Sequence, residues 1–367
     1  MAVIEKLIIN QFRNIENQYI EPKKGINLVI GSNAQGKTNL LESIYYLGHN
    51  RSFKTTKLSE IIGYKKNSLD ISAIVDEKKI TLKKTTNKTK INIDNTTVAS
   101  SSKLTKLLPI QIITPDKGFV INGTPKNKRS YLDWGLFHVK PELLQTYKTY
   151  NKTLKNINSL LNKNQTNDLE YWYLELTKTA RIINENRDKY VKNLTKITQS
   201  LNDKYLKKIV NNTEKFEYSL FTGWPKEVGD LNEANIYKYL IKQTNNFARL
   251  KFLSCGAHKA SIKFYLNNKN ESLLSRGQQK KYSLIFWLSQ IELLVQQGVH
   301  PIVLIDDISS ELDKDKTKTI MSCLELLNIQ AFITDISSNT STHQNHKQAT
   351  FLIDNGTIKT HNSLPIN

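Results

Sequence analysis

The hydrophobic pattern is clearest near the N-terminus, where an apolar run, a glycine-bounded loop and an amphipathic segment follow one another. Residues 26–30 have the apolar character of a buried strand, and residues 31–37 are mostly small or polar. Apolar residues then recur on one helix face, at Leu40, Leu41, Ile44, Tyr45 and Leu47. Because this spacing matches the period of an α-helix, the sequence predicts a strand, a tight loop and a helix.

The following regions differ in the period of their hydrophobic pattern. Residues 3–9 and 18–30 are predicted strands, and residues 69–98 hold short β-rich runs between turn residues, which predicts an antiparallel meander. From residue 141 to about 210 apolar positions recur at steps of three and four, which predicts long helices. The two apolar stripes are Leu143, Tyr147, Tyr150, Leu154, Ile157 and Leu161, and then Tyr190, Leu194, Ile197, Leu201, Tyr205 and Ile209.

Strand patterns return in the C-terminal third of the chain. We expect strands at 215–221, 250–254 and 261–267, a helix that opens near residue 275, and buried strands within 301–307, 330–336 and 350–359. Buried strands that alternate with helices indicate an α/β fold. We therefore predict a discontinuous head of residues 1–125 and 246–367, with a mainly helical lobe of residues 126–245 inserted into it.

Charge adds a question about partners. The net charge is +20, from 53 Lys+Arg against 33 Asp+Glu. A polyanionic partner, either nucleic acid or an acidic membrane surface, would explain this excess. Compositional enrichment in lysine on solvated faces would explain it equally well, and lysine also protects edge strands from pairing with other chains. The charge alone leaves both explanations open.

Neither cysteine chemistry nor a membrane is indicated. Cys255 and Cys323 lie far apart and form no metal or redox motif. The longest apolar run is too short and too polar to cross a bilayer, and the N-terminus lacks the layout of a signal peptide. We expect a soluble cytoplasmic protein without a membrane partner.

The loop before the first predicted helix reads G-x-x-x-x-G-K-T, the spacing of a Walker A phosphate loop. Its backbone N–H groups and the helix N-terminus would bind phosphate oxygens. Lys37 would reach the β- and γ-phosphates, and the Thr38 hydroxyl would ligate Mg²⁺. The predicted contacts to a nucleoside triphosphate are Gly31, Ser32, Asn33, Ala34, Gln35, Gly36, Lys37 and Thr38.

A second apolar run, residues 302–305, ends in two acids. Asp306 would hold Mg²⁺ opposite Thr38, as in a Walker B strand, and Asp307 would polarise the attacking water. The predicted catalytic residues are therefore Asp307 and Lys37. An ordinary strand end would give the same pattern.

The run S-R-G-Q-Q opens a predicted helix ahead of that strand. Ser275, the Gly277 backbone, Gln278 and the helix N-terminus would form a second anion site. One chain has no evident use for it, whereas two chains placed head to tail could each close this signature on the γ-phosphate of the other. The alternative is an amphipathic helix with serine as its N-cap.

Six blocks of sequence, in this order, resemble the bacterial RecF recombination-repair family. They are FRNIEN from Phe12, GSNAQGKTNLLESIYYLGHNRSFKT from Gly31, PIQIITPDKGFVINGTPKNKRSYLDWG from Pro109, GAHKA from Gly256, SRGQQKK from Ser275 and LIDDISSELD from Leu304. The resemblance implies an ABC-type P-loop ATPase head with a β-rich lobe and an inserted helical lobe. The chain departs from the family at Ala257, which replaces a proline, and at Asp335, where no switch histidine follows the strand.

The resemblance implies ATP and Mg²⁺ as cofactors and weak, DNA-dependent ATP hydrolysis. It further implies an ATP-dependent homodimer that binds duplex DNA at single-strand gaps, without sequence specificity, and assists RecA loading with RecO and RecR. Gln111 would be the Q-loop glutamine that senses Mg²⁺ and the γ-phosphate. Candidate basic contacts are Arg51, Lys54, Lys57, Lys126, Lys128 and Arg129.

Two other classes of function remain. In the first, a binding module would use ATP only to join two copies, with incidental turnover. In the second, the chain would be the ATPase subunit of a membrane transporter. The wide separation of the two Walker motifs disfavours the transporter.

Overall fold

The computed structural model describes residues 2–114, 120–204, 214–307, 314–335 and 348–360. The chain divides into two compact units, of which the first comprises residues 1–117 and 294–367 and the second residues 118–293. The predicted insertion, 126–245, lies within the second unit, which extends further at both ends. None of the described helices has the length and hydropathy needed to span a bilayer.

The first unit holds a six-stranded antiparallel sheet with the order β2-β1-β4-β5-β6-β7. Its strands are β1 (Ile4–Phe12), β2 (Ile15–Ile20), β4 (Ser68–Val75), β5 (Lys78–Thr85), β6 (Thr89–Ile93) and β7 (Thr96–Thr97). Burial alternates residue by residue along β4, as expected for a sheet with one covered face. The predicted meander is confirmed.

A second six-stranded sheet in this unit has the order β15-β14-β3-β13-β12-β8. Its strands are β3 (Ile26–Ile30), β8 (Ile110–Ile113), β12 (Ile302–Ile305), β13 (Ala331–Asp335), β14 (Ala349–Asp354) and β15 (Thr357–Thr360). All neighbours are parallel except β14 and β15. All five residues of β3 are buried, as is typical of a central parallel strand.

The helix predicted after the glycine loop is α1 (Lys37–His49), which contacts strands of both sheets. Leu40, Leu41, Ile44 and Leu47 lie in one core cluster with residues of both sheets. The other helical elements of this unit are η1 (Leu58–Glu60), α2 (Ser101–Leu107) and α10 (Lys314–Leu326). The predicted continuous strand 18–30 is wrong, because β2 ends at Ile20 and β3 begins at Ile26, with Pro22 between them.

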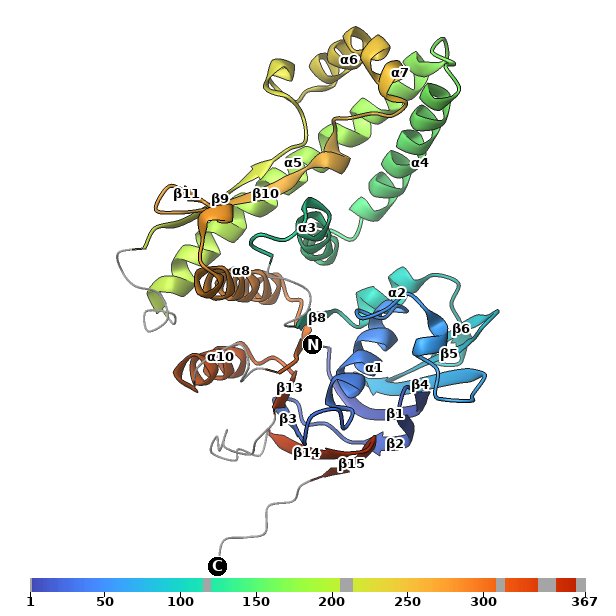
Figure 1. Ribbon diagram of the computed structural model, residues 1–367, viewed down its shortest axis with the longest axis vertical. Helices are drawn as coiled ribbons and strands as arrows, with labels where there is room; N and C mark the ends of the chain where they lie inside the picture. The colour runs from blue at the N-terminus through green and yellow to red at the C-terminus, as the bar shows by residue number, and fades with distance from the viewer. Residues whose placement is uncertain (1, 115–119, 205–213, 308–313, 336–347, 361–367) are drawn as a thin grey trace, which may run out of the picture. The chain divides into compact units, whose positions relative to one another are not determined.

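The second unit is built around a helical hairpin of α4 (Leu143–Asn162) and α5 (Leu169–Lys204), which lie side by side (Figure 1). The predicted stripes supply buried residues to both helices, including Tyr150 and Ile157 on α4 and Leu194 and Leu201 on α5. Tyr205 and Ile209 lie outside the described residues. The remaining helices are α3 (Pro125–Val139), η3 (Lys226–Val228), α6 (Glu233–Lys242), α7 (Thr244–Leu250), η4 (Ala257–Lys259), η5 (Glu271–Leu273) and α8 (Arg276–Gln296).

A three-stranded sheet, β11-β10-β9, explains why the second unit reaches beyond residue 245. Its strands are β9 (Phe216–Phe221), β10 (Ser261–Leu266) and β11 (Lys269–Asn270). Because β10 pairs with β9 along its whole length, residues 261–266 belong with the inserted segment. The strand predicted at 250–254 is wrong: Lys251 has φ 67° and caps α7, and the Leu253 N–H donates to Asn158 Oδ1 at 2.9 Å.

Candidate nucleotide site

The glycine loop joins β3 to α1, as the sequence predicts, and its glycines stand where side chains do not fit. Gly36 has φ 116° and is the N-cap of α1, a conformation that favours glycine. A Cβ on Gly31 would lie 2.4 Å from the carbonyl oxygen of Ile353 in β14. The loop therefore needs both glycines for its backbone to turn into the helix.

A pocket within the first unit collects residues from four separate parts of the chain. Its lining residues are Asn33, Ala34, Gly36, Lys37, Thr38, Asn39, Lys54, Asp306, Asp307 and Thr334. Five of the eight predicted loop contacts and both predicted Walker B acids are among them. The pocket thus brings together the two motifs that the sequence separates by about 270 residues.

Lys37 is folded back against its own loop. Its Nζ donates to the carbonyl oxygens of Gly31 at 2.6 Å and Ser32 at 2.9 Å. Burial lowers the pKa of Lys37, while the carboxylates of Asp307, Asp306 and Asp335 act in the opposite direction. An ammonium group has three donors, so a phosphate oxygen can bind alongside the two carbonyls.

Asp306 lies at the centre of a hydrogen-bond network that joins helix α1 to β13 and to the end of β12. Its Oδ1 accepts from Thr38 Oγ1 at 3.0 Å and from Thr334 Oγ1 at 2.8 Å. Thr334 Oγ1 also accepts from the Asp307 N–H at 2.7 Å. Burial raises the pKa of Asp306, and the two threonine hydrogen bonds oppose that shift.

The donor set around Asp306 fits Mg²⁺. A hydroxyl and a buried carboxylate lie within 3.0 Å of each other, and oxygen ligands of this kind suit a small hard cation. A cation here would also favour the ionised form of Asp306, against the effect of burial. Thr38 and Asp306 are thus the residues that could hold the metal.

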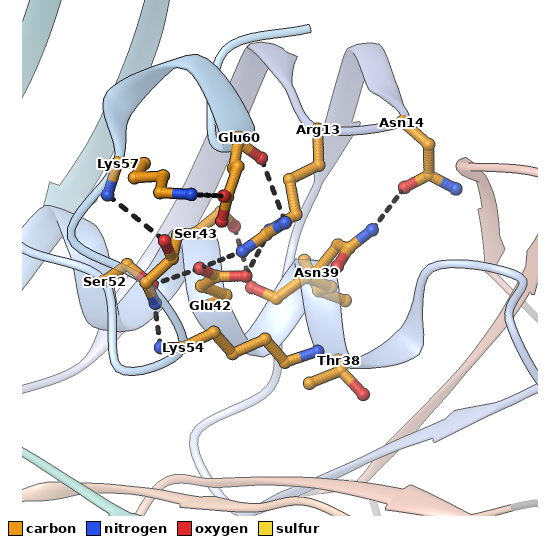
Figure 2. A network of polar contacts seen from close by, with 12 residues as sticks. Arg13, Asn14, Thr38, Asn39, Glu42, Ser43, Ser52, Lys54, Lys57 and Glu60 are labelled. Atoms are coloured by element: carbon orange, nitrogen blue, oxygen red, sulfur yellow. Dashed lines mark hydrogen bonds and ion pairs between the residues drawn. The ribbon is translucent and has the colours of Figure 1, made fainter.

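Gln35 lies in the phosphate loop but serves to anchor it. Its backbone carbonyl accepts from the Gly356 N–H at 2.8 Å and from Asn14 Nδ2 at 3.2 Å, and its Oε1 accepts from the Asn355 N–H at 2.6 Å. The turn between β14 and β15 and the turn between β1 and β2 therefore both hold the loop. Asn14 also accepts from Asn39 Nδ2 at 2.8 Å, as Figure 2 shows.

The proposed signature forms a reciprocal cap at the start of α8. Ser275 Oγ accepts from the Gln278 N–H at 3.2 Å, and Gln278 Oε1 accepts from the Ser275 N–H at 3.1 Å. This is the capping-box arrangement, so the alternative of a capped helix describes the local structure well. Gly277 is exposed, and a Cβ placed on it would have no heavy atom within 4 Å. The cap thus leaves an open helix N-terminus.

Other predicted residues lie in different environments. Gln111 is buried within β8 and does not line the pocket. Arg51, Lys57 and Lys126 are exposed, as a DNA contact requires. Lys54, another predicted basic contact, is also exposed and in addition lines the pocket.

Two of the predicted basic contacts are bound within the protein. The Lys128 side chain is only 3% exposed and its Nζ forms an ion pair with Glu271. Arg129 is partly buried, and its Nη1 donates to the Ala260 carbonyl oxygen at 2.9 Å. Lys128 is therefore unsuited to a direct contact with DNA phosphate, whereas Arg129 uses one of its donors within the protein.

Sequence reasoning missed Thr334 and the anchoring role of Asn14 and Asn355. Thr334 directly precedes Asp335, the position at which the sequence analysis looks for a switch histidine. The end of this strand was therefore recognised as part of the site, but Thr334 itself was not. Its role depends on β13 lying between β3 and β12, which periodicity does not reveal. The SSELD run that follows Walker B includes residues 309–313, which lie outside the described residues.

Comparison with known proteins identifies the family. A family model described as the RecF/RecN/SMC N terminal domain matches residues 3–359. A curated protein of Histophilus somni (strain 129Pt), described as DNA replication and repair protein RecF, is 34% identical over 97% of this chain and 99% of its own. The chain belongs to the RecF family. A relative from Mannheimia succiniciproducens with the same description is 33% identical over 97% of this chain and 99% of its own.

Solved structures agree with this assignment. The structure of a recombination mediator protein RecF with ATP, of the RecFOR pathway, matches with a TM-score of 0.85 at 28% identity, over 98% of both chains. An Smc head domain derived from Pyrococcus furiosus matches with a TM-score of 0.58 at 14% identity, over 98% of this chain and 96% of that one. The predicted ABC-type α/β head is confirmed, and the chain is a member of a family of DNA replication and repair proteins.

The hydroxyl of Thr334, which hydrogen-bonds both Asp306 Oδ1 and the Asp307 N–H, can be tested for its contribution to stability. Thr334→Val keeps the side-chain shape but removes the hydroxyl, so Asp306 loses a donor and the Asp307 N–H loses its acceptor. We expect the free energy of unfolding, measured in urea, to fall by about 1–3 kcal/mol. Thr334→Ser keeps the hydroxyl and should lie much closer to wild type. A valine variant as stable as wild type would contradict this role.

Proposed function

We propose that the chain is an ATP-dependent DNA-binding protein of recombinational repair that hydrolyses ATP slowly. The observation that carries the proposal is the pocket in which Lys37 and Thr38 of the phosphate loop meet Asp306 and Asp307. Glycines, a lysine, a hydroxyl and two acids in one pocket match the needs of a Mg²⁺-bound triphosphate. The RecF protein solved with ATP supports the choice of nucleotide.

In the proposed reaction, each side chain of the pocket has a separate role. Lys37 and the N–H groups of the loop would bind the β- and γ-phosphates, and Thr38 and Asp306 would hold the Mg²⁺ that neutralises them. Asp307 would orient a water for attack on the γ-phosphorus and accept its proton. The bond between the γ-phosphorus and the bridging oxygen then breaks, which releases ADP and inorganic phosphate.

Replacement of Asp307 tests whether the pocket is catalytic. Asp307→Asn keeps the volume but removes the base, so we expect phosphate release to slow by about 10²-fold or more. ATP affinity, measured by calorimetry on the same preparation, should be nearly unchanged. Unaltered phosphate release would mean that hydrolysis is incidental and that ATP serves only to join two copies.

The proposal includes an ATP-dependent homodimer. The open helix N-terminus at Ser275 and Gly277 is suited to an anion, and the helix dipole would favour one. We infer that this signature, with Gln278, binds the γ-phosphate of a second copy, and that the second copy does the same in return. The nucleotide would thereby link two heads around DNA.

Sedimentation velocity tests the dimer. At micromolar concentration, wild type should sediment as a dimer with ATP and Mg²⁺ and as a monomer without them. Ser275→Arg removes the cap and fills the anion site, so the dimer should be lost. Ser219→Arg places the same charge at an exposed serine of β9 and should leave the dimer intact. A wild-type protein that stays monomeric with saturating ATP contradicts the proposal.

DNA recognition would depend on charge. No sequence-reading motif is present, and the net charge of +20 favours phosphate contacts. Arg51, Lys54, Lys57 and Lys126 are the exposed candidates. The finer role, binding duplex at single-strand gaps and assisting RecA loading with RecO and RecR, is supported by the family and by the pathway named for its solved relative.

Salt dependence of DNA binding tests this mode of recognition. With ATP present, log affinity for duplex DNA should fall linearly with log salt, with a slope of about −0.9 for each phosphate neutralised. Lys126→Gln should reduce that slope by about one contact if Lys126 binds a phosphate. Duplexes of equal length and different sequence should bind alike. A salt-insensitive or strongly sequence-dependent affinity would contradict contact through phosphates.

A further inference from the structure

Lys128 is a buried cation that the proposed function does not use. It lies in the first turn of α3, its side chain is only 3% exposed, and its Nζ donates to Glu271 Oε1. The same Nζ lies 5.2 Å from the centre of the Phe264 ring in β10. Glu271 opens η5, the short turn that comes just before Ser275. The acidic end of this ion pair therefore adjoins the signature.

Stability does not by itself account for this ion pair. Glu271 Oε2 is buried, and no group among the described residues donates a hydrogen bond to it. The removal of two charges from water is costly, and their attraction offsets that cost only when the remaining hydrogen-bonding atoms are satisfied. Apolar side chains of similar volume are often as good or better for stability. What the pair does provide is a fixed position for Glu271 against α3.

Hydrogen bonds connect Glu271 to the signature. The Leu274 N–H donates to the Glu271 carbonyl oxygen at 3.3 Å, and Gln279 Nε2 donates to the Leu274 carbonyl oxygen at 2.8 Å. The Leu274 side chain is buried. Ser275 follows directly and forms the reciprocal cap with Gln278. The turn is thus closed onto α8, so a shift of Glu271 would also move the Ser275 hydroxyl.

Helix α3 is fixed to α8 at a second point, beyond the signature. Tyr131 OH donates to the Phe286 carbonyl oxygen at 3.2 Å, and Gln290 Nε2 donates to the Tyr131 carbonyl oxygen at 3.1 Å. The ring centres of Tyr131 and Phe286 lie 5.1 Å apart. α3 therefore contacts the chain on both sides of the signature, at the turn that contains Glu271 and along α8.

We propose that Lys128 and Glu271 are positioning residues for the signature, and that their ion pair sets the direction of Ser275 and of the α8 N-terminus. The proposal rests on the proposed ATP-dependent dimer, in which this signature binds the γ-phosphate of a second copy. A hydrogen bond to phosphate depends on the direction of its donor, and a displacement of about 1 Å removes much of its contribution. Lys128 and Glu271 act through the turn and do not bind the phosphate themselves.

Substitution of Lys128 tests the proposal. Lys128→Met removes the charge, keeps an unbranched side chain and leaves the Glu271 carboxylate without its partner. In sedimentation velocity with saturating ATP and Mg²⁺, we expect the dissociation constant of the dimer to rise by about tenfold or more, the effect of losing one charge-assisted hydrogen bond. Lys128→Arg keeps the ion pair and should dimerise like wild type.

A double variant separates positioning from stability. Lys128→Met combined with Glu271→Met replaces the pair with two apolar side chains, so the free energy of unfolding in urea should return close to that of wild type. The direction imposed by the ion pair would still be missing, so the dimer should stay about tenfold weaker. Because no buried charge is left unpaired, this variant also provides the test if Lys128→Met fails to fold. Wild-type dimerisation by the double variant would mean that packing alone positions the signature, and it would overturn the proposal.

Asp133→Asn is the matched control. Asp133 also lies on α3, and its carboxylate pairs with Arg187 of α5, whose side chain is 3% exposed. The substitution neutralises the acid of another ion pair on the same helix, away from the signature. It should lower the free energy of unfolding and leave the dissociation constant of the dimer unchanged. A dimer as weak as that of Lys128→Met would assign the effect to general loss of stability and overturn the proposal.

ATP binding by a single copy separates this proposal from the proposed function. The nucleotide pocket is lined by residues of the first unit, whereas Lys128 and Glu271 belong to the second. In a Ser275→Arg background, which should keep the protein monomeric, Lys128→Met should not change ATP affinity measured by calorimetry. A loss of affinity there, or a Lys128→Met dimer as tight as wild type, overturns this proposal alone. A wild-type protein that stays monomeric with saturating ATP overturns the proposed dimer and this proposal with it.

Discussion

The nucleotide site depends on one hydrogen bond between residues far apart in sequence, from Thr38 Oγ1 to Asp306 Oδ1 at 3.0 Å. It forms because β3, β13 and β12 are parallel neighbours, so their carboxyl ends meet at the same edge of the sheet. The first turn of α1, which follows β3 and the glycine loop, supplies Thr38, β13 supplies Thr334, and Asp306 follows β12 directly. Strand order therefore determines which side chains can share a metal ion or a phosphate.

The same convergence explains the balance of charge in the pocket. Asp306 and Asp307 face Lys37 and Lys54, and Asp335 is buried close enough to favour the charged form of Lys37. The charge of Lys54 thus opposes the effect of burial, which raises the pKa of Asp306. A Mg²⁺-bound triphosphate would bring both signs of charge to a site that already pairs them, with little reorganisation of the surrounding side chains.

Local parts of this architecture could be predicted, because short sequence patterns determine them. The β3-loop-α1 unit, the acids after β12 and the alternating meander follow from spacing and period. Thr334 could not be found, because its role depends on β13 lying between two other strands. The sequence predicts that the inserted lobe ends at residue 245, whereas the second unit extends further, because β10 pairs with β9 across forty residues. Lys128 looked like a surface cation, although Glu271, 143 positions away, pairs with it.

The motif that begins at Ser275 is compatible with two different roles. Serine with glutamine three residues later is a capping box, and the structure contains one. The same serine and helix N-terminus also suit an anion, so a cap and a phosphate-binding signature share one geometry. Gly277 is the second residue of α8, and a Cβ there would meet no heavy atom within 4 Å, so packing within the chain does not require glycine at this position. The exposed glycine is instead compatible with the proposed anion site, in which a phosphate would approach the backbone N–H groups closely.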